Sequence, residues 1–326
     1  TEHLQKLTGG NPLLLAETLF GLISAGLITR NLAGWDIRLE GIRLCNLPKN
    51  LSDFAQAQLC ASTPKQHRLL ELLAALDAPA SHFYLATLAQ REVSSVLADL
   101  EALVALTVLI RQQSSQESVY SYRHRCTREY LYNETAPSRR RELHHAIAQS
   151  LEQGSPTTSP QMIEQIAHHY CEAVDQQSGP RFAFRAAYIA LEHAATDRAI
   201  SFFLKGLDLV PRNDAALRFE GLEAVAALLL MRGDSDRAAK FYQEMLLLAR
   251  MAGIPSKEAL AIRETSRVLI ESGDVTRGLA YAQDAAARFR ELEDAPGEIA
   301  SLVLWAFALL RKGDTMAADL LAREAF

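Results

Sequence analysis

The residues best suited to chemistry near the start of the sequence are the glycines and the proline of LTGGNPLLLAETL, from Leu7 to Leu19. Gly9 and Gly10 allow a tight turn, or the close approach of another molecule to the backbone. Pro12 can open the helix that follows, because the first helical residue needs no amide donor. The run therefore predicts a helix start, or a turn that lies against a ligand.

A second polar cluster surrounds a single histidine in the run VYSYRHRCTREYLY. His124 stands there between Arg123 and Arg125, at the end of a β-prone segment. Taken alone, a histidine at such a position is typical of an imidazole that is satisfied by a backbone carbonyl.

Four further histidines form two pairs of sequence neighbours on expected helices. Adjacent helical positions point about 100° apart, whereas two ligands from one helix to one metal lie four residues apart. We therefore expect one packed and one solvated histidine in each pair, and no metal site. The pairs are His144 with His145 and His168 with His169.

No run of the sequence carries a recognisable catalytic motif. G-x-x-x-x-G-K-[ST], the loop that holds nucleotide phosphates, is absent, and no serine lies in a G-x-S-x-G elbow. We expect no catalytic residue here and no ATP hydrolysis by this chain alone. The four cysteines are widely spaced without a CxxC pair, which predicts neither a zinc clip nor a disulfide framework.

The chain that must position these residues has 326 residues, with 34 Lys and Arg against 39 Asp and Glu. The net charge of −5 supplies no general attraction to nucleic acid. Only 16 glycines and 11 prolines occur, which favours long helices. The most apolar stretch, from Leu13 to Ile28, contains Glu17 and is short for a membrane span, so it predicts a buried helix.

A repeat of 40 residues organises the second half of the sequence. GD dipeptides begin at Gly233, Gly273 and Gly313, and each separates an apolar helical segment from a second helix with small residues on one face. An earlier copy starts at Ala194, and the segment from Met162 onward resembles a further hairpin. The repeat predicts a stack of helical hairpins.

These hairpins resemble tetratricopeptide repeats. The period is longer than that family's usual length of about 34 residues, which implies longer helices or loops. Small residues are needed where neighbouring helices cross closely. The resemblance implies a solenoid whose concave surface binds a peptide, a protein or a small ligand. The first copy shows the family's pattern at Ala194, Ala199, Phe203, Gly206 and Pro211.

The segment between Asn46 and Tyr132 has a different pattern. Several helical stretches precede two β-prone runs, TVLIR and VYSYRH, which the polar run RQQSSQES separates. Helices followed by such a hairpin predict a winged helix. Its presumed recognition helix carries Glu92, Asp99 and Glu101 but no lysine or arginine, so we expect it to repel phosphates and to pack against protein.

Taken together, these elements resemble the signal-transduction ATPases with numerous domains, of the type of the maltose-regulon activator. Gly10, Asn11 and Pro12 match the G-x-P motif of that family, which lies beside the bound adenine. The resemblance gives His124 the role of sensing the nucleotide's phosphates from the wing. Arg125 stands where that family usually has aspartate, which weakens the match.

The predicted fold class is all-α with a small β wing: a winged helix followed by an α-solenoid of tetratricopeptide-like hairpins. We expect residues 1–46 to be the C-terminal lid part of an upstream nucleotide-binding domain. Residues 47–154 form the winged helix with a connecting helix, and residues 155–326 form the repeat stack. Thr1 and the uncapped helical pattern at the end lead us to expect a piece of a longer chain.

By resemblance, the function is that of the regulatory and sensor portion of a multidomain signalling ATPase. The lid and winged helix would close over ATP or ADP that the upstream domain holds, and the repeats would bind an inducer or a protein partner. We expect no direct contact with nucleic acid or membrane, and a cytoplasmic location. The alternatives are a winged-helix regulator that reads DNA itself and a plain repeat scaffold for protein interaction.

Overall fold

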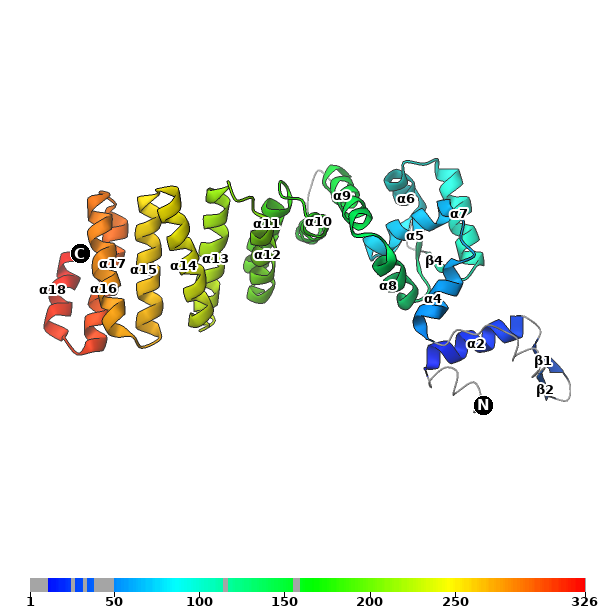
Figure 1. Cartoon of the computed structure of the whole chain (residues 1–326), viewed down its shortest axis with the longest axis horizontal. Helices are drawn as coiled ribbons and strands as arrows, with labels where there is room; N and C mark the ends of the chain where they lie inside the picture. Colours follow the sequence, from blue (N-terminus) through cyan, green and yellow to red (C-terminus); the bar gives the residue numbers. More distant parts are fainter. Residues whose placement is uncertain are drawn as a thin grey trace. The chain divides into compact units, whose positions relative to one another are not determined.

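A computed structural model describes residues 11–24, 27–31, 34–37, 50–113, 117–154 and 159–325 of the chain. Contacts between Cα atoms divide it into two units, Thr1–Ser150 and Leu151–Phe326. Helices dominate both units (Figure 1). The predicted class, all-α with a small β wing, is confirmed.

The first unit opens with the helix α2 (Pro12–Ser24), which an antiparallel hairpin of β1 (Ile28–Asn31) and β2 (Gly34–Ile37) follows. Leu14 and Leu22 lie eight residues apart on α2 and are buried. The predicted buried helix therefore ends before Ile28, which lies in β1, and only one of its sides is buried while the other meets solvent.

The winged helix combines helices with a three-stranded antiparallel sheet in the order β3-β5-β4. The predicted wing is the β4–β5 hairpin, in which Leu109 lies opposite Tyr122. In chain order the elements are α4 (Leu51–Leu59), α5 (Pro64–Leu76), β3 (Ala80–Ser81), α6 (His82–Ala89), α7 (Val93–Ala105), β4 (Leu109–Gln113), β5 (Ser118–Tyr122), α8 (Arg125–Glu134) and α9 (Pro137–Gly154).

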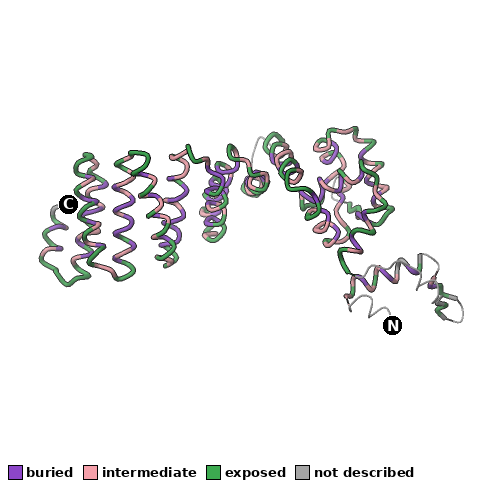
Figure 2. The backbone as a smooth tube through the Cα atoms, viewed as in Figure 1, coloured by how far each residue is buried: buried purple, intermediate pink, exposed green. Residues whose placement is uncertain are grey.

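One hydrophobic core joins the helices of the winged helix to its sheet. Leu70 of α5, Leu85 of α6 and Leu100 of α7 are almost completely buried in it, together with Tyr120 of the middle strand. Figure 2 shows buried segments of the trace among the helices of this unit. Burying such side chains stabilises the unit by about 1.5–3 kcal/mol each, so the wing and α7 are held as one body.

The second unit consists of helices that pack in chain order, each against the next. The pairs α11 with α12, α13 with α14, α15 with α16 and α17 with α18 are the predicted hairpins. The helices are α10 (Pro160–Glu172), α11 (Gly179–Glu192), α12 (Thr196–Leu209), α13 (Ala215–Met231), α14 (Ser235–Ala252), α15 (Pro255–Glu271), α16 (Val275–Glu291), α17 (Ala295–Lys312) and α18 (Thr315–Ala325).

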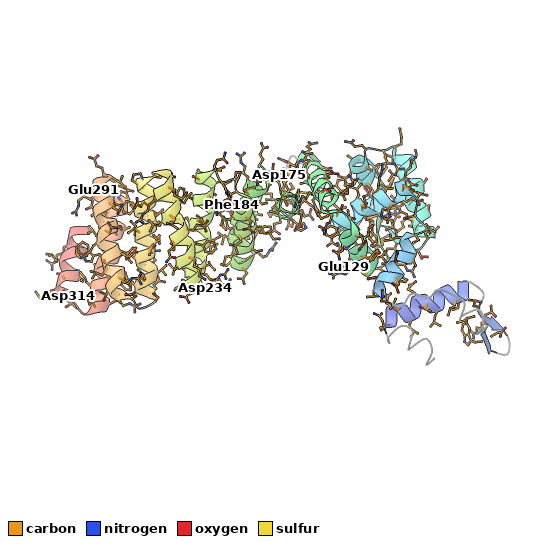
Figure 3. The ribbon with its side chains drawn as sticks, in the orientation of Figure 1. Glu129, Asp175, Phe184, Asp234, Glu291 and Asp314 are labelled. Atoms are coloured by element: carbon orange, nitrogen blue, oxygen red, sulfur yellow. The ribbon has the colours of Figure 1, made fainter. Side chains whose placement is uncertain are left out.

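The turns inside the hairpins repeat with the sequence. Gly233, Gly273 and Gly313 adopt φ values of 78°, 96° and 92°, in the left-handed region that favours glycine. The aspartate after each of them caps the second helix through its side chain, as Asp234 and Asp314 do at the ends of their hairpins (Figure 3). The helices from α13 to α17 run 17 or 18 residues, so the long period lies in the helices.

Phe184 shows why small residues recur where helices cross. Its ring fills the space between Gly206 of α12 and Gly221 of α13, where an added Cβ atom would lie 2.6 Å and 2.5 Å from it. Glycine at both positions lets three helices approach around one buried aromatic ring. The small residue predicted at position 206 therefore has a packing role.

Candidate functional site

Asn11 and Pro12 begin the helix α2. The side-chain oxygen of Asn11 accepts hydrogen bonds from the amides of Leu13 and Leu14, at 3.0 and 3.3 Å. Pro12 is exposed and occupies the first helical position. Gly10 lies outside the described residues. The contacts of Asn11 and Pro12 are those of a helix start.

His124 contacts the same helix through Glu17. Its Nε2 atom lies 3.1 Å from Oε1 of Glu17, and both side chains are largely buried. The contact is not a well-directed hydrogen bond, since the buried Nε2 has no hydrogen-bond partner among the described residues. The imidazole ring also meets the ring of Phe54 edge-on, with centroids 5.5 Å apart. Glu17 follows Pro12 by five residues, about 7.5 Å along the helix, so α2 and His124 share one neighbourhood.

A cavity of about 310 Å³ lies where β5 ends and α8 begins. Arg123, Arg125 and Arg128 line it, and Asp77 pairs with Arg128 at 2.5 Å. The residues that begin α2 are not part of its lining. The structure therefore places a basic cavity beside His124, while Asn11 and Pro12 lie outside it.

The two histidine pairs differ. His169 is buried and His168 is exposed, as predicted, whereas His144 is buried and its neighbour His145 is half-buried rather than solvated. The Nε2 atom of His144 lies 2.8 Å from the hydroxyl of Tyr132. In the described part of the chain, no group of three or more histidine, cysteine or acidic residues could hold a metal. The cysteines described there, Cys60, Cys126 and Cys171, are free.

The helix α7 uses two of its acidic residues in pairs with neighbouring elements. Asp99 lies 2.6 Å from Arg91, and Glu101 accepts hydrogen bonds from Arg111 and from the hydroxyl of Tyr120. The bond from Tyr120 lowers the pKa of Glu101. These pairs reduce the predicted repulsion of phosphates, but the helix itself still carries no cation that would attract them.

The first helices of the four hairpins expose the same repeat position. Tyr188, Ala227, Arg267 and Phe307 occupy it, 39, 40 and 40 residues apart, and all four are exposed. Tyr188 and Phe307 are each 44% exposed, which is high for large aromatic residues. We call the surface marked by these four residues the repeat face.

Side-chain contacts join neighbouring helices along the repeat face. The hydroxyl of Tyr188 on α11 donates a hydrogen bond to Glu220 on α13, at 3.0 Å. Lys257 on α15 reaches Glu223 on α13, at 3.2 Å, and α15 also contacts α17. Since each first helix touches the next, the repeat face is continuous.

The repeat face is hollowed between α11 and α13 by a groove of about 520 Å³. Burial, together with the hydrogen bond to Glu220, raises the pKa of Tyr188 to about 12, so this hydroxyl stays a donor at neutral pH. The remaining lining combines apolar and charged side chains. The groove is lined by Ile163, Arg181, Phe184, Arg185, Tyr188, Ile189, Glu192, Leu217 and Glu220.

Two functional candidates escaped the sequence analysis. In the sequence, Glu17 is only a break in an apolar run. A single acidic residue in an apolar helix nevertheless indicates that it has a partner in the interior. Arg181 and Arg185 drew no attention, because their spacing of four residues is common on helices. Among the described residues they have no acidic partner within ion-pair distance, and both line a groove.

The chain matches no protein-family model and no curated protein. Among solved structures it is similar to nearly identical TPR-like repeats from Podospora anserina, with 16% identity over 58% of this chain and 93% of that one and a TM-score of 0.45. Aspartyl phosphate phosphatase F from Bacillus subtilis shares 12% identity over 75% of this chain and 62% of its own, with a TM-score of 0.45.

A further similar structure is that of a Signal Transduction ATPase with Numerous Domains protein with a tetratricopeptide repeat sensor, from Pyrococcus horikoshii. It is 16% identical, and the match covers 99% of this chain and 56% of that one, with a TM-score of 0.32. The fold class described above rests on this chain's own helices and turns.

In the described residues, no helix combines the length and the apolar character that crossing a bilayer requires.

Proposed function

We propose that the repeat unit is a protein-interaction module that binds an extended segment of a partner protein along the repeat face. The observation that carries this proposal is the groove of about 520 Å³ between α11 and α13, with the exposed Tyr188 at its side. Large aromatic residues that remain exposed beside a groove are typical of binding surfaces, because burying them on binding contributes strongly to affinity.

The proposal is tested by blocking the repeat face without disturbing the fold. A random peptide library is selected on the full chain, and the dissociation constants of the selected peptides are measured by fluorescence anisotropy. Ala227→Gln adds a long, uncharged side chain at an exposed position of the repeat face, so we expect it to weaken binding about tenfold or more. Ala280→Gln makes the same change at an exposed position of α16 and serves as the control.

Selected peptides that bind both variants as tightly as the unchanged chain would contradict the proposal, because they would bind elsewhere. Failure to select any peptide with a dissociation constant below about 1 mM would also contradict it, since a fitted segment should gain at least about 4 kcal/mol. Circular dichroism of the two variants establishes that both fold as the unchanged chain does.

We propose, as a second function, that the first unit takes part in a nucleotide switch within a longer protein. The specific observation in its favour is the Glu17–His124 contact beside a cavity lined by three arginines. Arginines suit the phosphates of ATP or ADP, whereas Asn11 and Pro12 do not line the cavity, so the described residues fit the phosphate part alone. A nucleotide that an upstream domain binds there would supply negative charge that holds α2 and the segment around His124 together.

The nucleotide switch is tested in a protein that carries the upstream nucleotide domain. ADP retained after gel filtration is measured for His124→Ala and Pro12→Ala. We expect His124→Ala to lose bound ADP, because the phosphates lose a neighbouring donor. Unchanged retention in both variants would contradict the switch. Glu17→Gln separates the two roles of His124, the contact with α2 and the contact with phosphates, since it removes the first and keeps the imidazole.

Direct reading of DNA by the winged helix is the weaker alternative. Arg111 of the wing is engaged by Glu101, and α7 carries no lysine or arginine. Phosphate contacts supply most of the affinity of DNA-binding domains. A gel shift of the full chain at low salt tests the point, and we expect no shifted band.

A further inference from the structure

We infer that the protein segment bound on the repeat face is acidic and that Arg181 and Arg185 bind its carboxylates. This inference rests on the proposed function and names the chemistry of the partner. The two arginines lie on α11, four residues apart, and therefore on the same side of the helix. Both are exposed and both line the groove between α11 and α13.

Arg181 and Arg185 lack an acidic partner within the described residues, unlike most arginines of the second unit. Arg218 pairs with Glu244, and Arg232 pairs with Asp197 on a neighbouring hairpin. Most arginines of the second unit are therefore neutralised by an acidic residue of the same unit. The pair on α11 offers two planar guanidinium groups whose geometry matches carboxylates and whose charge is not balanced by its neighbours.

Two carboxylates also line the groove, and neither lies within ion-pair distance of Arg181 or Arg185. Glu220 accepts the hydrogen bond from the hydroxyl of Tyr188. Glu192 follows Arg185 by seven residues, about 10 Å along α11. One end of α11 in the groove is therefore cationic and the other end is acidic. A partner segment that lies along the groove would place its acidic residues at the cationic end.

The apolar lining sets a second requirement for the partner. Ile163, Phe184 and Leu217 contribute to the groove from three helices. An acidic side chain with an apolar neighbour can satisfy the arginines and the apolar lining at once. A nucleic acid fits less well, because its continuous negative charge would also meet Glu192 and Glu220. The chemistry favours a peptide segment in which acidic and apolar residues alternate or adjoin.

The inference is tested with the same random peptide library, selected on the full chain. We expect aspartate and glutamate to be enriched in the selected peptides, next to an apolar residue. The double variant Arg181→Gln with Arg185→Gln should abolish this enrichment. The control is Arg212→Gln with Lys240→Gln, which removes the same charge at two exposed positions that have no acidic partner among the described residues. Selection on the control should resemble selection on the unchanged chain.

Affinities sharpen the test. A selected acidic peptide is compared with its version in which asparagine and glutamine replace the acids. We expect the neutral peptide to bind about tenfold to hundredfold more weakly to the unchanged chain. The two peptides should bind equally to the Arg181→Gln, Arg185→Gln variant. Raising the salt concentration from 50 to 300 mM should weaken the acidic peptide and leave the neutral one nearly unchanged.

The outcomes distinguish this inference from the function on which it rests. Peptides that lack acidic enrichment but still lose binding in Ala227→Gln would overturn the inference and leave the interaction module standing. Acidic enrichment that survives in the double arginine variant would also overturn the inference, because the acids would bind elsewhere. A phosphoserine peptide that binds more than about tenfold more tightly than its aspartate counterpart would assign the arginines to phosphate instead.

Discussion

The helices α11 and α15 each carry two arginines four residues apart and use them differently. On α15, Arg263 and Arg267 both reach Glu264, at 2.8 and 3.5 Å, and this carboxylate is almost completely buried. On α11, Arg181 and Arg185 have no carboxylate of the described residues within ion-pair distance and line a groove instead. The difference lies in one acidic residue on the same helix.

The comparison shows that residue type alone does not reveal whether an arginine stabilises the fold or is available to bind a ligand. A buried carboxylate must be paired, because leaving it alone in the interior costs several kcal/mol. Arg263 and Arg267 are therefore committed to the fold. Among the described residues, Arg181 and Arg185 have no buried acidic partner, so their charge remains available to a ligand. The predictions below break or sharpen this contrast, beginning with the largest effect.

The largest effect is expected beneath the groove. Phe184 occupies on α11 the repeat position that Arg263 occupies on α15, and it is buried against Phe203. Phe184→Ala should lower the free energy of unfolding by about 3–5 kcal/mol, because it leaves a cavity at the crossing of three helices. Urea denaturation followed by circular dichroism measures it. Arg185→Ala, directly beside it, should change the free energy by less than about 0.5 kcal/mol. Similar values for both would remove the distinction between core and groove.

A smaller effect is expected at the buried acid of α15. Glu264→Gln should lower the free energy of unfolding by about 1.5–3 kcal/mol, since two charge-assisted contacts lose their acceptor charge. Glu271→Gln removes an exposed acid from the end of the same helix and is the matched control. The released arginines should also add affinity for acidic peptides. A Glu264→Gln variant as stable as the control would show that pairing on α15 is not structural.

The hydroxyl of Tyr188 donates a hydrogen bond to Glu220, one of the two acidic residues that line the groove. Tyr188→Phe should weaken the binding of acidic peptides about threefold, because Glu220 becomes free to attract the arginines or to repel the ligand.

The pKa of Tyr188 is raised from 10.0 to about 12, so its stabilising contribution is complete below pH 10 and is lost as the pH rises through 12.

This titration is measured as tyrosinate absorbance near 295 nm. The difference between the unchanged chain and Tyr188→Phe should be one tyrosine that ionises near pH 12. A difference curve centred near pH 10 would show that the hydroxyl is neither buried nor held by Glu220. Tyr281→Phe, on α16, controls for the loss of one ring.

The smallest effect is expected at a pair that is open to solvent. Arg125 and Glu129 lie 2.6 Å apart on α8, with side chains 83% and 45% exposed. Exposed pairs contribute little, because water and salt already screen their charges. Arg125→Ala should leave the urea midpoint of the first unit unchanged. A clear decrease would mean that exposed pairing also stabilises this protein, and the contrast between α11 and α15 would lose its basis.

Much of the fold could be predicted from the sequence because it depends on neighbours along the chain. Left-handed glycines at 233, 273 and 313 and the aspartates that follow them determine where each hairpin turns. The wing follows from two β-prone runs around a polar break. The hairpin of β1 and β2 escaped prediction, because strands of four residues are too short to show an alternating pattern.

The nucleotide residues show where sequence reasoning stops. The start of α2 at Asn11 and Pro12 is local and agrees with a helix-start motif. The role predicted for Gly10, Asn11, Pro12 and His124 depends on which surfaces meet, and it stays a prediction. The structure adds Glu17 as the residue of α2 that reaches His124, across 107 positions of the chain.

The sequence by itself determined the helical hairpins, their period and the winged-helix segment, since propensity, capping and turn conformation act over a few residues. Only the tertiary structure decided which charged groups neutralise one another. Ion pairing depends on distances of a few ångströms between residues that lie far apart in the chain. For that reason the arginines of α15 are paired with a buried carboxylate of the fold, and those of α11 remain open to a partner.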